Sequence, residues 1–299
     1  MTTTQDTSIH PTAIVSADAT VEPGAQIGPG CIIEGPAIIR SGVNLIANVH
    51  VAGDTQIGEN TTIYPYACVG FGPQHIKIKP GSPIGGLTIG NDCVIREQTT
   101  IHAAMEPGER TIVGDRLFLM ATAHIGHDCI IGNDVVMCNG ALAAGHVEIH
   151  DKAFLSGMVA VHQFCRIGRG AMLGGGTIAS SEVPPFCTLV AMNTLGGLNL
   201  VGMRRGGTSA EDISKTKEAY RKAFRVRLPK DQQLAILDEL GESCEPVRLM
   251  AEFMRTSKRS VSLGDGKPRP HIMQWLRSDE GKSTLAGSAP QDGTDNGVA

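Results

Sequence analysis

The amino-acid sequence predicts a mainly β fold, a parallel β-helix of short stacked strands followed by a small α-helical domain. Two observations support this prediction. Apolar residues recur at every sixth position over most of the chain, and the recurrence stops at a pair of prolines, after which apolar residues follow helical spacing. The 299-residue chain contains 41% hydrophobic but only 4% aromatic residues, so small aliphatic side chains are expected to fill its interior.

The six-residue period is nearly unbroken. Every sixth residue from Val15 to Val69 is apolar, and the step resumes from Ile89 to Ala179 with Pro107 as its exception. Small or β-branched residues lie two positions before most of these, where they suit a tight inner corner. A period of six fits neither a 3.6-residue helix nor a two-residue strand alternation. It is typical of a hexapeptide β-solenoid, in which each hexad supplies one short strand and one turn.

The breaks in this period predict the boundaries of the β-helix. It is expected over residues 9–187, with loop insertions at about 70–86 and 103–110 where the period is interrupted. Pro184 and Pro185 end it, because proline removes a backbone donor from the strand ladder.

The chain beyond the prolines is expected to be largely helical. Residues 188–207 are predicted to be a linker with substrate contacts, and residues 208–262 an α-helical C-terminal domain. Ser209 resembles a helix N-cap and is followed by apolar residues at helical spacing, with further helices expected at about 230–240 and 245–258. Residues 263–299 are rich in Gly, Ser, Asp and Pro, which predicts a largely disordered tail.

The composition of the chain indicates which partners and which cellular compartment to expect. A formal net charge of -4 gives no global reason to expect nucleic acid or an anionic membrane as a partner. No stretch approaches the roughly 20 apolar residues of a membrane span, and the Thr-rich N-terminus lacks a signal-peptide pattern, so a cytoplasmic protein is expected. The eight cysteines form no CxxC pair, and packing is favoured over disulfides or zinc for them.

Polar residues gather in the second half of the repeat. If three hexads form one coil, as the resemblance to known hexapeptide solenoids implies, residues 18 apart stack on neighbouring coils about 4.8 Å apart. Positions 125, 143 and 161 are related in this way. The residues that follow them directly are therefore expected to cluster: His127, Gly145, His146, His162 and Gln163.

An imidazole is the usual general base for a hydroxyl nucleophile. His127, with Asp128 adjacent, is the best candidate, and the N–H of Gly145 could stabilise an oxyanion next to it. Two other interpretations remain open for this cluster. The histidines could be structural, or three of them could bind Zn²⁺, as in hexapeptide solenoids that resemble γ-class carbonic anhydrases.

Four segments carry a more specific resemblance. His10–Ile14, His124–Cys129, Gly145–Val147 and Val161–Phe164 resemble motifs of UDP-N-acetylglucosamine O-acyltransferases, and the likeness extends over about residues 9–258. The resemblance implies a left-handed β-helix and a homotrimer. It further implies transfer of an R-3-hydroxyacyl group from acyl carrier protein to the glucosamine 3-hydroxyl of UDP-N-acetylglucosamine, the first step of lipid A biosynthesis.

The same resemblance implies roles for individual residues and no metal or other cofactor. His127 would be the general base, Asp128 its orienting partner and the Gly145 N–H the oxyanion donor, while Gly175 corresponds to the position that limits acyl-chain length. A glycine there favours a longer chain. The residues implied to bind substrate are Gln74, Lys77, His102, His124, His146, His162, Gln163, Asn199, Arg204 and Arg205.

Two departures from the family pattern leave alternatives open. His75 stands where members commonly carry an aspartate, so a 3-amino acceptor is an alternative to the 3-hydroxyl. Val201 replaces a glutamate, and the interval from Asn199 to the arginine pair is one residue short, so either arginine could face the ligand.

The acidic carrier protein is expected to dock on local basic residues. The candidates are Arg166, Arg169, Arg204, Arg205, Arg221, Lys222, Arg225 and Arg227. Two rival classes make different predictions. The N-acyltransferases of the same pathway carry an additional N-terminal domain, whereas coils begin here by Val15, and a purely structural solenoid would have no stacked polar cluster.

Overall fold

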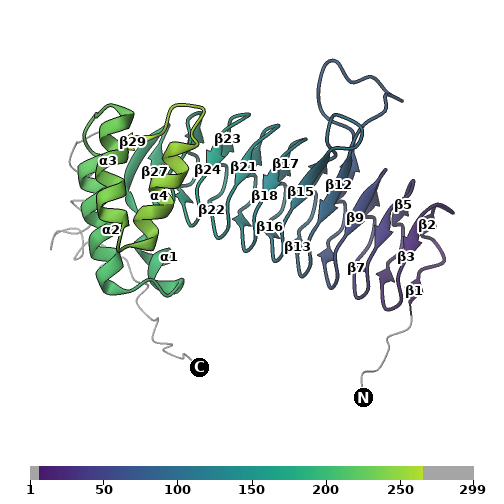
Figure 1. Ribbon diagram of the computed structural model, residues 1–299. Coiled ribbons are helices and arrows are strands. Elements are labelled where there is room, and N and C mark those ends of the chain that lie inside the picture. The colour runs from purple at the N-terminus through teal and green to yellow at the C-terminus, as the bar shows by residue number, and fades with distance from the viewer. Residues whose placement is uncertain (1–6, 265–299) are drawn as a thin grey trace, which may run out of the picture. The chain divides into compact units, whose positions relative to one another are not determined.

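The computed structural model describes residues 7–264 of the chain (Figure 1). Almost all of the tail predicted at 263–299 lies outside these residues. Within them the chain forms three sheets and four helices, and no helix there is long and apolar enough to cross a membrane.

Three parallel sheets form the sides of the β-helix. The first sheet contains β1 (Ser8–Ile9), β4 (Gln26–Ile27), β7 (Asn44–Leu45), β10 (Thr62–Ile63), β13 (Val94–Ile95), β16 (Phe118–Leu119), β19 (Val136–Met137), β22 (Phe154–Leu155) and β25 (Met172–Leu173). The second contains β2 (Ile14–Val15), β5 (Ile32–Ile33), β8 (His50–Val51), β11 (Cys68–Phe71), β14 (Thr100–His102), β17 (His124–Ile125), β20 (Leu142–Ala143), β23 (Ala160–Val161) and β26 (Ile178–Ala179). The third contains β3 (Thr20–Val21), β6 (Ile38–Ile39), β9 (Thr55–Ile57), β12 (Gly86–Ile89), β15 (Arg110–Val113), β18 (Ile130–Ile131), β21 (Glu148–Ile149) and β24 (Arg166–Ile167).

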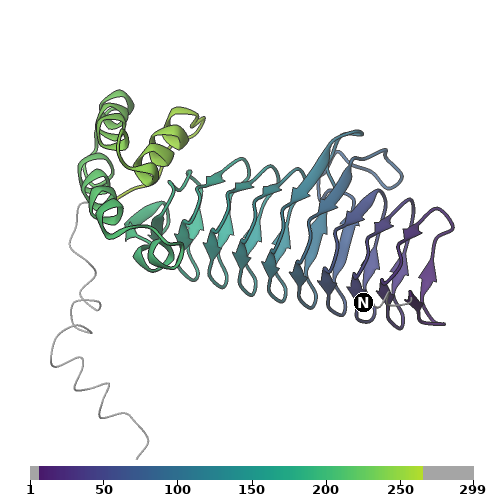
Figure 2. The same ribbon diagram turned by 60° about the horizontal axis from the view of Figure 1, so that its bottom comes forward.

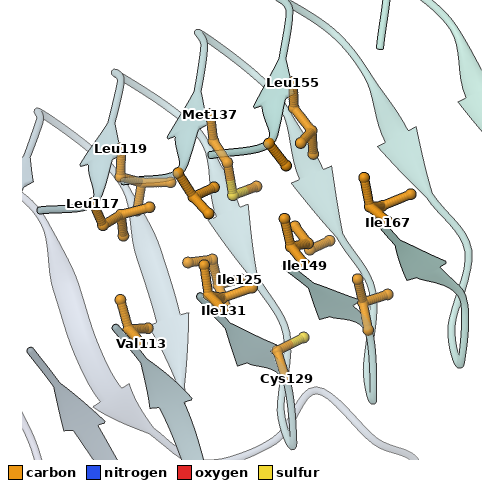
Figure 3. Close-up of a cluster of buried hydrophobic side chains, with 14 of the residues drawn as sticks. Val113, Leu117, Leu119, Ile125, Cys129, Ile131, Met137, Ile149, Leu155 and Ile167 are labelled. Carbon is orange, nitrogen blue, oxygen red and sulfur yellow. The ribbon is translucent and has the colours of Figure 1, made fainter. Parts of the chain in front are cut away.

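Three hexads make each coil. Ile125 of β17 pairs with Ala143 of β20, which pairs with Val161 of β23, so each strand lies beside the strand 18 residues along the chain. From Ile27 onwards, with Pro107 as the exception, the periodic residue points inward and is buried, and Figure 3 shows Ile131 and Leu155 among those that fill the interior. Because each two-residue strand turns one side chain in and the other out, the six-residue period alone determines which residues form the core.

Four cysteines follow the same rule and are buried at the small-residue position of their hexads: Cys31, Cys93, Cys129 and Cys165. Cys129, at the small-residue position of its hexad, is fully buried in the core (Figure 3). All eight cysteines are free, and burial raises the pKa of this thiol to about 12, so it stays protonated and packs as a small apolar side chain.

Two loops interrupt the coils at the same corner. The first joins β11 to β12 and the second joins β14 to β15, and both leave the second sheet and enter the third. Their backbones are bonded together, since the Gly85 N–H donates to the Ala104 carbonyl over 2.9 Å and the Ala104 N–H donates to the Gly86 carbonyl over 3.1 Å. We call these loops the first insertion (residues 72–85) and the second insertion (residues 103–109).

The chain beyond the coils contains more regular structure than a linker. The segment 188–207 holds most of an antiparallel hairpin, β27 (Cys187–Ala191) and β28 (Thr194–Leu198), and the short helix α1 (Leu200–Arg205). Helices α2 (Ala210–Ala223), α3 (Lys230–Gly241) and α4 (Glu245–Arg255) follow (Figures 1 and 2). Ser209 caps α2 as its sequence predicts, because its Oγ accepts the Asp212 N–H over 3.0 Å.

The last described segment covers the exposed end of the coils. Strand β29 (Leu263–Gly264) adds to β28, and the buried Glu182 carboxylate accepts hydrogen bonds from Arg166 over 2.7 Å and from Ser257 over 2.8 Å. An uncovered strand edge would offer unpaired backbone groups to another chain. The helical segment and its return strand therefore close this end of the β-helix.

Candidate active site

Three stacked turns bring the predicted polar residues together. They follow β17, β20 and β23, which are neighbours in the second sheet. Asp128, His146 and Phe164 occupy the same position in the three turns, each with a positive φ near 60°. Because the turns share one backbone conformation, equivalent side chains leave the β-helix in the same direction. The 18-residue spacing thus places His127, Gly145 and Gln163 in one column.

His127 and Asp128 form a hydrogen-bonded pair. The distance from His127 Nδ1 to Asp128 Oδ2 is 2.6 Å, and the two side chains are only 13% and 14% exposed. A carboxylate can only accept, so Nδ1 carries the hydrogen and Nε2 presents a lone pair. This is the tautomer that a general base requires.

Two neighbours hold the Asp128 carboxyl and backbone in place. The Met105 N–H, in the second insertion, donates to Oδ1 over 3.2 Å, and the Asp128 N–H donates to the buried Thr111 hydroxyl over 2.8 Å. Sequence reasoning did not identify Met105 or Thr111 as site residues. Thr111 had a detectable signal, since a hydroxyl stands there at the small-residue position that Cys129 occupies one coil later.

Gly145 lies directly against the His127 ring. A Cβ at this position would lie 2.6 Å from both Nε2 and Cε1 of His127, so only glycine leaves room for the imidazole. In residues 7–264 no hydrogen-bond acceptor is assigned to the Gly145 N–H. A free backbone donor beside the lone pair of a base is the arrangement that stabilises an oxyanion formed next to that base.

Two further histidines face the pair. The His146 ring centroid lies 5.1 Å from that of His127, and the ring stacks on Phe164 at 4.6 Å with an interplanar angle of 9°. The His75 ring, from the first insertion, lies 6.0 Å from His127 and nearly perpendicular to it. Its Nδ1 accepts the Lys77 N–H over 3.2 Å, so neutral His75 carries its hydrogen on Nε2.

His124 and His102 form a second, more buried pair. His124 Nδ1 lies 2.7 Å from the Thr100 hydroxyl, and the two imidazole centroids are 5.1 Å apart. Burial, followed by repulsion from His124 and His127, lowers the pKa of His102 to about 4, and burial also lowers the pKa of His124. Both rings are therefore neutral at pH 7. His102 is only 6% exposed and supports His124 from behind instead of lining the open face.

The remaining predicted residues lie apart from this pair. Asn199 caps α1, since its Oδ1 accepts the Gly202 N–H over 2.9 Å, and its Nδ2 donates to the Gly170 carbonyl over 3.0 Å. Arg204 and Arg205 end that helix and are exposed. Within residues 7–264 no hydrogen bond, ion pair or ring contact joins α1 to His127. Five others are exposed, and no hydrogen bond or ring contact joins their side chains to the pair within residues 7–264: Gln74, Lys77, His162, Gln163 and Gly175.

The same cluster is also a candidate metal site. Ligand atoms of His127, Asp128 and His146 all lie within 4.8 Å of one another. Two ligands about 2.0 Å from one tetrahedral zinc ion lie about 3.3 Å apart, whereas Nδ1 of His127 is 2.6 Å from the carboxylate oxygen. That separation is the length of a hydrogen bond, so Nδ1 and Oδ2 as they stand do not both bind one ion.

A parallel β-helix of hexapeptide repeats with an imidazole–carboxylate pair beside a glycine backbone N–H is the arrangement expected of a hexapeptide-repeat acyltransferase. A family model described as UDP-N-acetylglucosamine O-acyltransferase, domain 2, matches residues 182–262. Two relatives are named acyl-carrier-protein–UDP-N-acetylglucosamine O-acyltransferases. The one from Thermodesulfovibrio yellowstonii is 44% identical over 85% of this chain and 98% of its own, and the one from Mesorhizobium japonicum is 51% identical over 73% and 78%.

Solved structures give the same result. The UDP-N-acetylglucosamine acyltransferase of Francisella novicida superposes with a TM-score of 0.81 at 32% identity, covering 88% of this chain and 99% of that one. The protein therefore belongs to the UDP-N-acetylglucosamine O-acyltransferase family and is an enzyme. The predicted fold, a left-handed parallel β-helix followed by a small α-helical domain, is confirmed.

Proposed function

We propose that the protein transfers an R-3-hydroxyacyl group from the thioester of acyl carrier protein to the 3-hydroxyl of the glucosamine unit of UDP-N-acetylglucosamine. This would be the first step of lipid A biosynthesis, carried out in the cytoplasm. One observation carries the proposal: the His127–Asp128 pair, 2.6 Å apart, stands with its free Nε2 beside the Gly145 backbone. The names of the relatives supply the two substrates.

In the first step, His127 Nε2 accepts the hydrogen of the 3-hydroxyl while the oxygen attacks the thioester carbonyl carbon. Asp128 stabilises the imidazolium that forms and keeps the ring in the required tautomer. A general base in this position accelerates such a reaction typically by about 10²- to 10⁴-fold. No metal is needed for this step, because the imidazole removes the hydrogen that an ion would otherwise have to acidify.

The negative charge that develops on the carbonyl oxygen during this attack is stabilised by the Gly145 N–H. Loss of one such donor typically costs about 10²- to 10³-fold in rate. The tetrahedral intermediate then collapses and the carbon–sulfur bond breaks. The pantetheine thiolate leaves and takes back the hydrogen from His127, so the products are the 3-O-acyl sugar nucleotide and the free thiol of the carrier protein.

The acceptor would lie between the stacked turns and the first insertion. His124, His146, His162 and Gln163 would hold the sugar and the nucleotide, with His102 supporting His124 from the interior. Gln74 and Lys77 would approach from the first insertion. Arg204 or Arg205 would bind the diphosphate, since a guanidinium matches phosphate oxygens in pairs, and Asn199 would set the direction of their helix.

The donor would occupy the open side of the coils near Gly175. A Cβ there would lie 3.5 Å from the Gly157 carbonyl, so the glycine leaves space for a long acyl chain. We expect a homotrimer with sites between neighbouring subunits. The carrier protein would dock on the exposed basic residues, but not on Arg166, whose side chain is only 13% exposed and is paired with Glu182.

A second acceptor is favoured by one observation. His75 lies 6.0 Å from His127, at the position where the acceptor must enter, and presents an Nε2–H that can donate to a neutral amine as well as to a hydroxyl. A 3-amino sugar nucleotide, acylated on nitrogen by the same steps, is therefore the alternative substrate.

Both are tested in one experiment. The protein is incubated with R-3-hydroxyacyl carrier proteins of several chain lengths and with either acceptor, and the products are identified by mass spectrometry. An acylated 3-hydroxyl product supports the proposal, and a product formed only from the 3-amino acceptor would assign the alternative. No product from any pair would overturn both.

A further inference from the structure

One arginine joins the bases of both insertions. Arg110 stands at the end of the second insertion and makes four hydrogen bonds. Its guanidinium donates to Asp54 Oδ2 over 2.6 Å, to the Asp54 carbonyl over 3.0 Å and to the Leu87 carbonyl over 2.7 Å, while its Nε donates to the Thr88 hydroxyl over 2.6 Å. Leu87 and Thr88 lie in β12, which follows directly on the first insertion. The planar guanidinium of Arg110 therefore links Asp54, in the coil before the insertions, to β12, the strand after the first insertion.

The backbone around this arginine is shaped to accept it. A Cβ on Gly86 would lie 2.5 Å from an Arg110 guanidinium nitrogen, and one on Gly85 would lie 2.4 Å from the Glu109 carbonyl. Two successive glycines thus let the first insertion end against the second. The Gly86 N–H donates to that Glu109 carbonyl over 2.9 Å.

Each insertion delivers one group to His127. The second insertion supplies the Met105 N–H that holds the Asp128 carboxylate, which in turn holds His127 Nδ1. The first insertion supplies His75, whose ring lies 6.0 Å from His127. Arg110 touches none of these residues, but it follows directly on the second insertion and is hydrogen-bonded to β12, which follows directly on the first.

We infer that Arg110 is a positioning residue that fixes both insertions over the His127–Asp128 pair, so that orientation of the base and binding of the acceptor depend on one side chain. The inference rests on the proposed function for its kinetic consequences. A displacement of about 1 Å in a catalytic constellation can cost about 10²-fold in rate. Release of the second insertion should therefore lower kcat, and release of the first should raise the KM for the sugar nucleotide.

The test compares Arg110→Met with Arg116→Met. Arg116 forms a similar pair between neighbouring coils, to both carboxylate oxygens of Asp134 over 2.7 and 3.0 Å, but contacts neither insertion. Arg110→Met should lose at least about 10-fold in kcat and raise the KM several-fold. Arg110→Lys should recover part of both, because lysine keeps the charge but not the fork. Asp54→Asn, which retains the carbonyl acceptor, gives a milder variant if Arg110→Met does not fold.

Hydrogen–deuterium exchange of the whole chain provides a readout independent of activity. Peptides covering 72–86 and 103–110 should exchange faster in Arg110→Met than in the wild type, while a peptide covering 142–161 should not change. Unchanged exchange in the two insertions would overturn the inference. Faster exchange with wild-type kcat and KM would also overturn it, since the arginine would then be structural only. A wild type that transfers no acyl group would instead refute the proposed function, and exchange alone would then decide whether Arg110 fixes the insertions.

Discussion

Gly145→Ala changes the site by one methyl group whose position is known. The added carbon would lie 2.6 Å from Nε2 of His127, whereas ordinary van der Waals contact begins at 3.4 Å, so the imidazole must move by about 0.8 Å, the difference of the two distances. That shift would stretch or break the 2.6 Å bond from Nδ1 to Asp128. A misplacement of this size is expected to lower kcat/KM by about 10²-fold.

The fold should not suffer from this substitution. Gly145 is not among the residues with positive φ, so alanine fits its backbone, and a glycine-to-alanine change there alters stability by no more than about 1 kcal/mol. Gly157→Ala is the matched control. Gly157 holds the same position in its hexad, two residues after the buried Leu155, and its added methyl would meet the Asn139 carbonyl at an ordinary 3.5 Å.

The assay measures acyl transfer at varied acceptor concentration, together with the thermal unfolding midpoint of each variant. We expect Gly145→Ala to fall about 100-fold in kcat/KM with an unchanged midpoint, and Gly157→Ala to keep both. If Gly145→Ala retains more than half of the wild-type kcat/KM, the close approach of Gly145 to His127 does not contribute to catalysis. An equal loss in both variants would attribute the effect to the turns and not to His127.

Three further outcomes follow from the same contacts. Asp128→Asn should lower kcat by about 10²- to 10⁴-fold with little change in the acceptor KM, because an amide no longer selects the correct tautomer of the base; steady-state kinetics checks this. Glu182→Ala should lower the unfolding midpoint by several degrees, because it leaves the 13%-exposed Arg166 side chain without its carboxylate partner, at a cost of about 3 kcal/mol in the free energy of unfolding. Arg116→Met removes one partner of an exposed ion pair and should cost less than about 1 kcal/mol. The pKa of His102 is lowered from 6.5 in the unfolded chain to about 4 in the folded protein. Above pH 6.5 the ring is neutral in both states and the folded protein has its full stability. As the pH falls toward 4 the unfolded chain binds a proton that the folded protein does not, which lowers the free energy of unfolding by about 2 kcal/mol at pH 5. In His102→Asn the unfolding midpoint should therefore decline less between pH 7 and pH 5 than in the wild type.

The repeat could be predicted from sequence because its physics is local. An inward residue at every sixth position requires only that a strand and a turn fit into six residues, and the choice of small residues such as Cys129 at the corners follows from the same geometry. Stacking then converts sequence spacing into spatial proximity. The approach of His127, Gly145 and His146 was predictable for this reason, once three hexads were assigned to each coil.

The contacts made by the insertions could not be predicted in this way. Residues 72–85 and 103–109 have no period, so no spacing rule indicates that Met105 reaches Asp128, or that His75 reaches His127. From sequence, Arg110 looks like any other arginine on a short strand, because its partners Asp54 and Leu87 are known only from the structure.

The region 188–207 was missed for another reason. Strand β28 contains Gly196 and Gly197, which weaken the apparent propensity for a strand, and the hairpin exists because β27 continues the first sheet beside β25. The hairpin therefore forms because a neighbouring coil is present to pair with it, and the sequence of residues 188–207 alone does not show that pairing.

The most direct measurement is the rate of acyl transfer from R-3-hydroxyacyl carrier protein to UDP-N-acetylglucosamine, in chelator-treated buffer, for the wild type and His127→Ala. The account predicts steady transfer by the wild type without added metal, and a loss of at least about 10²-fold in the variant. Transfer by His127→Ala at the wild-type rate, or a wild-type rate that appears only when a divalent metal is restored, would contradict it.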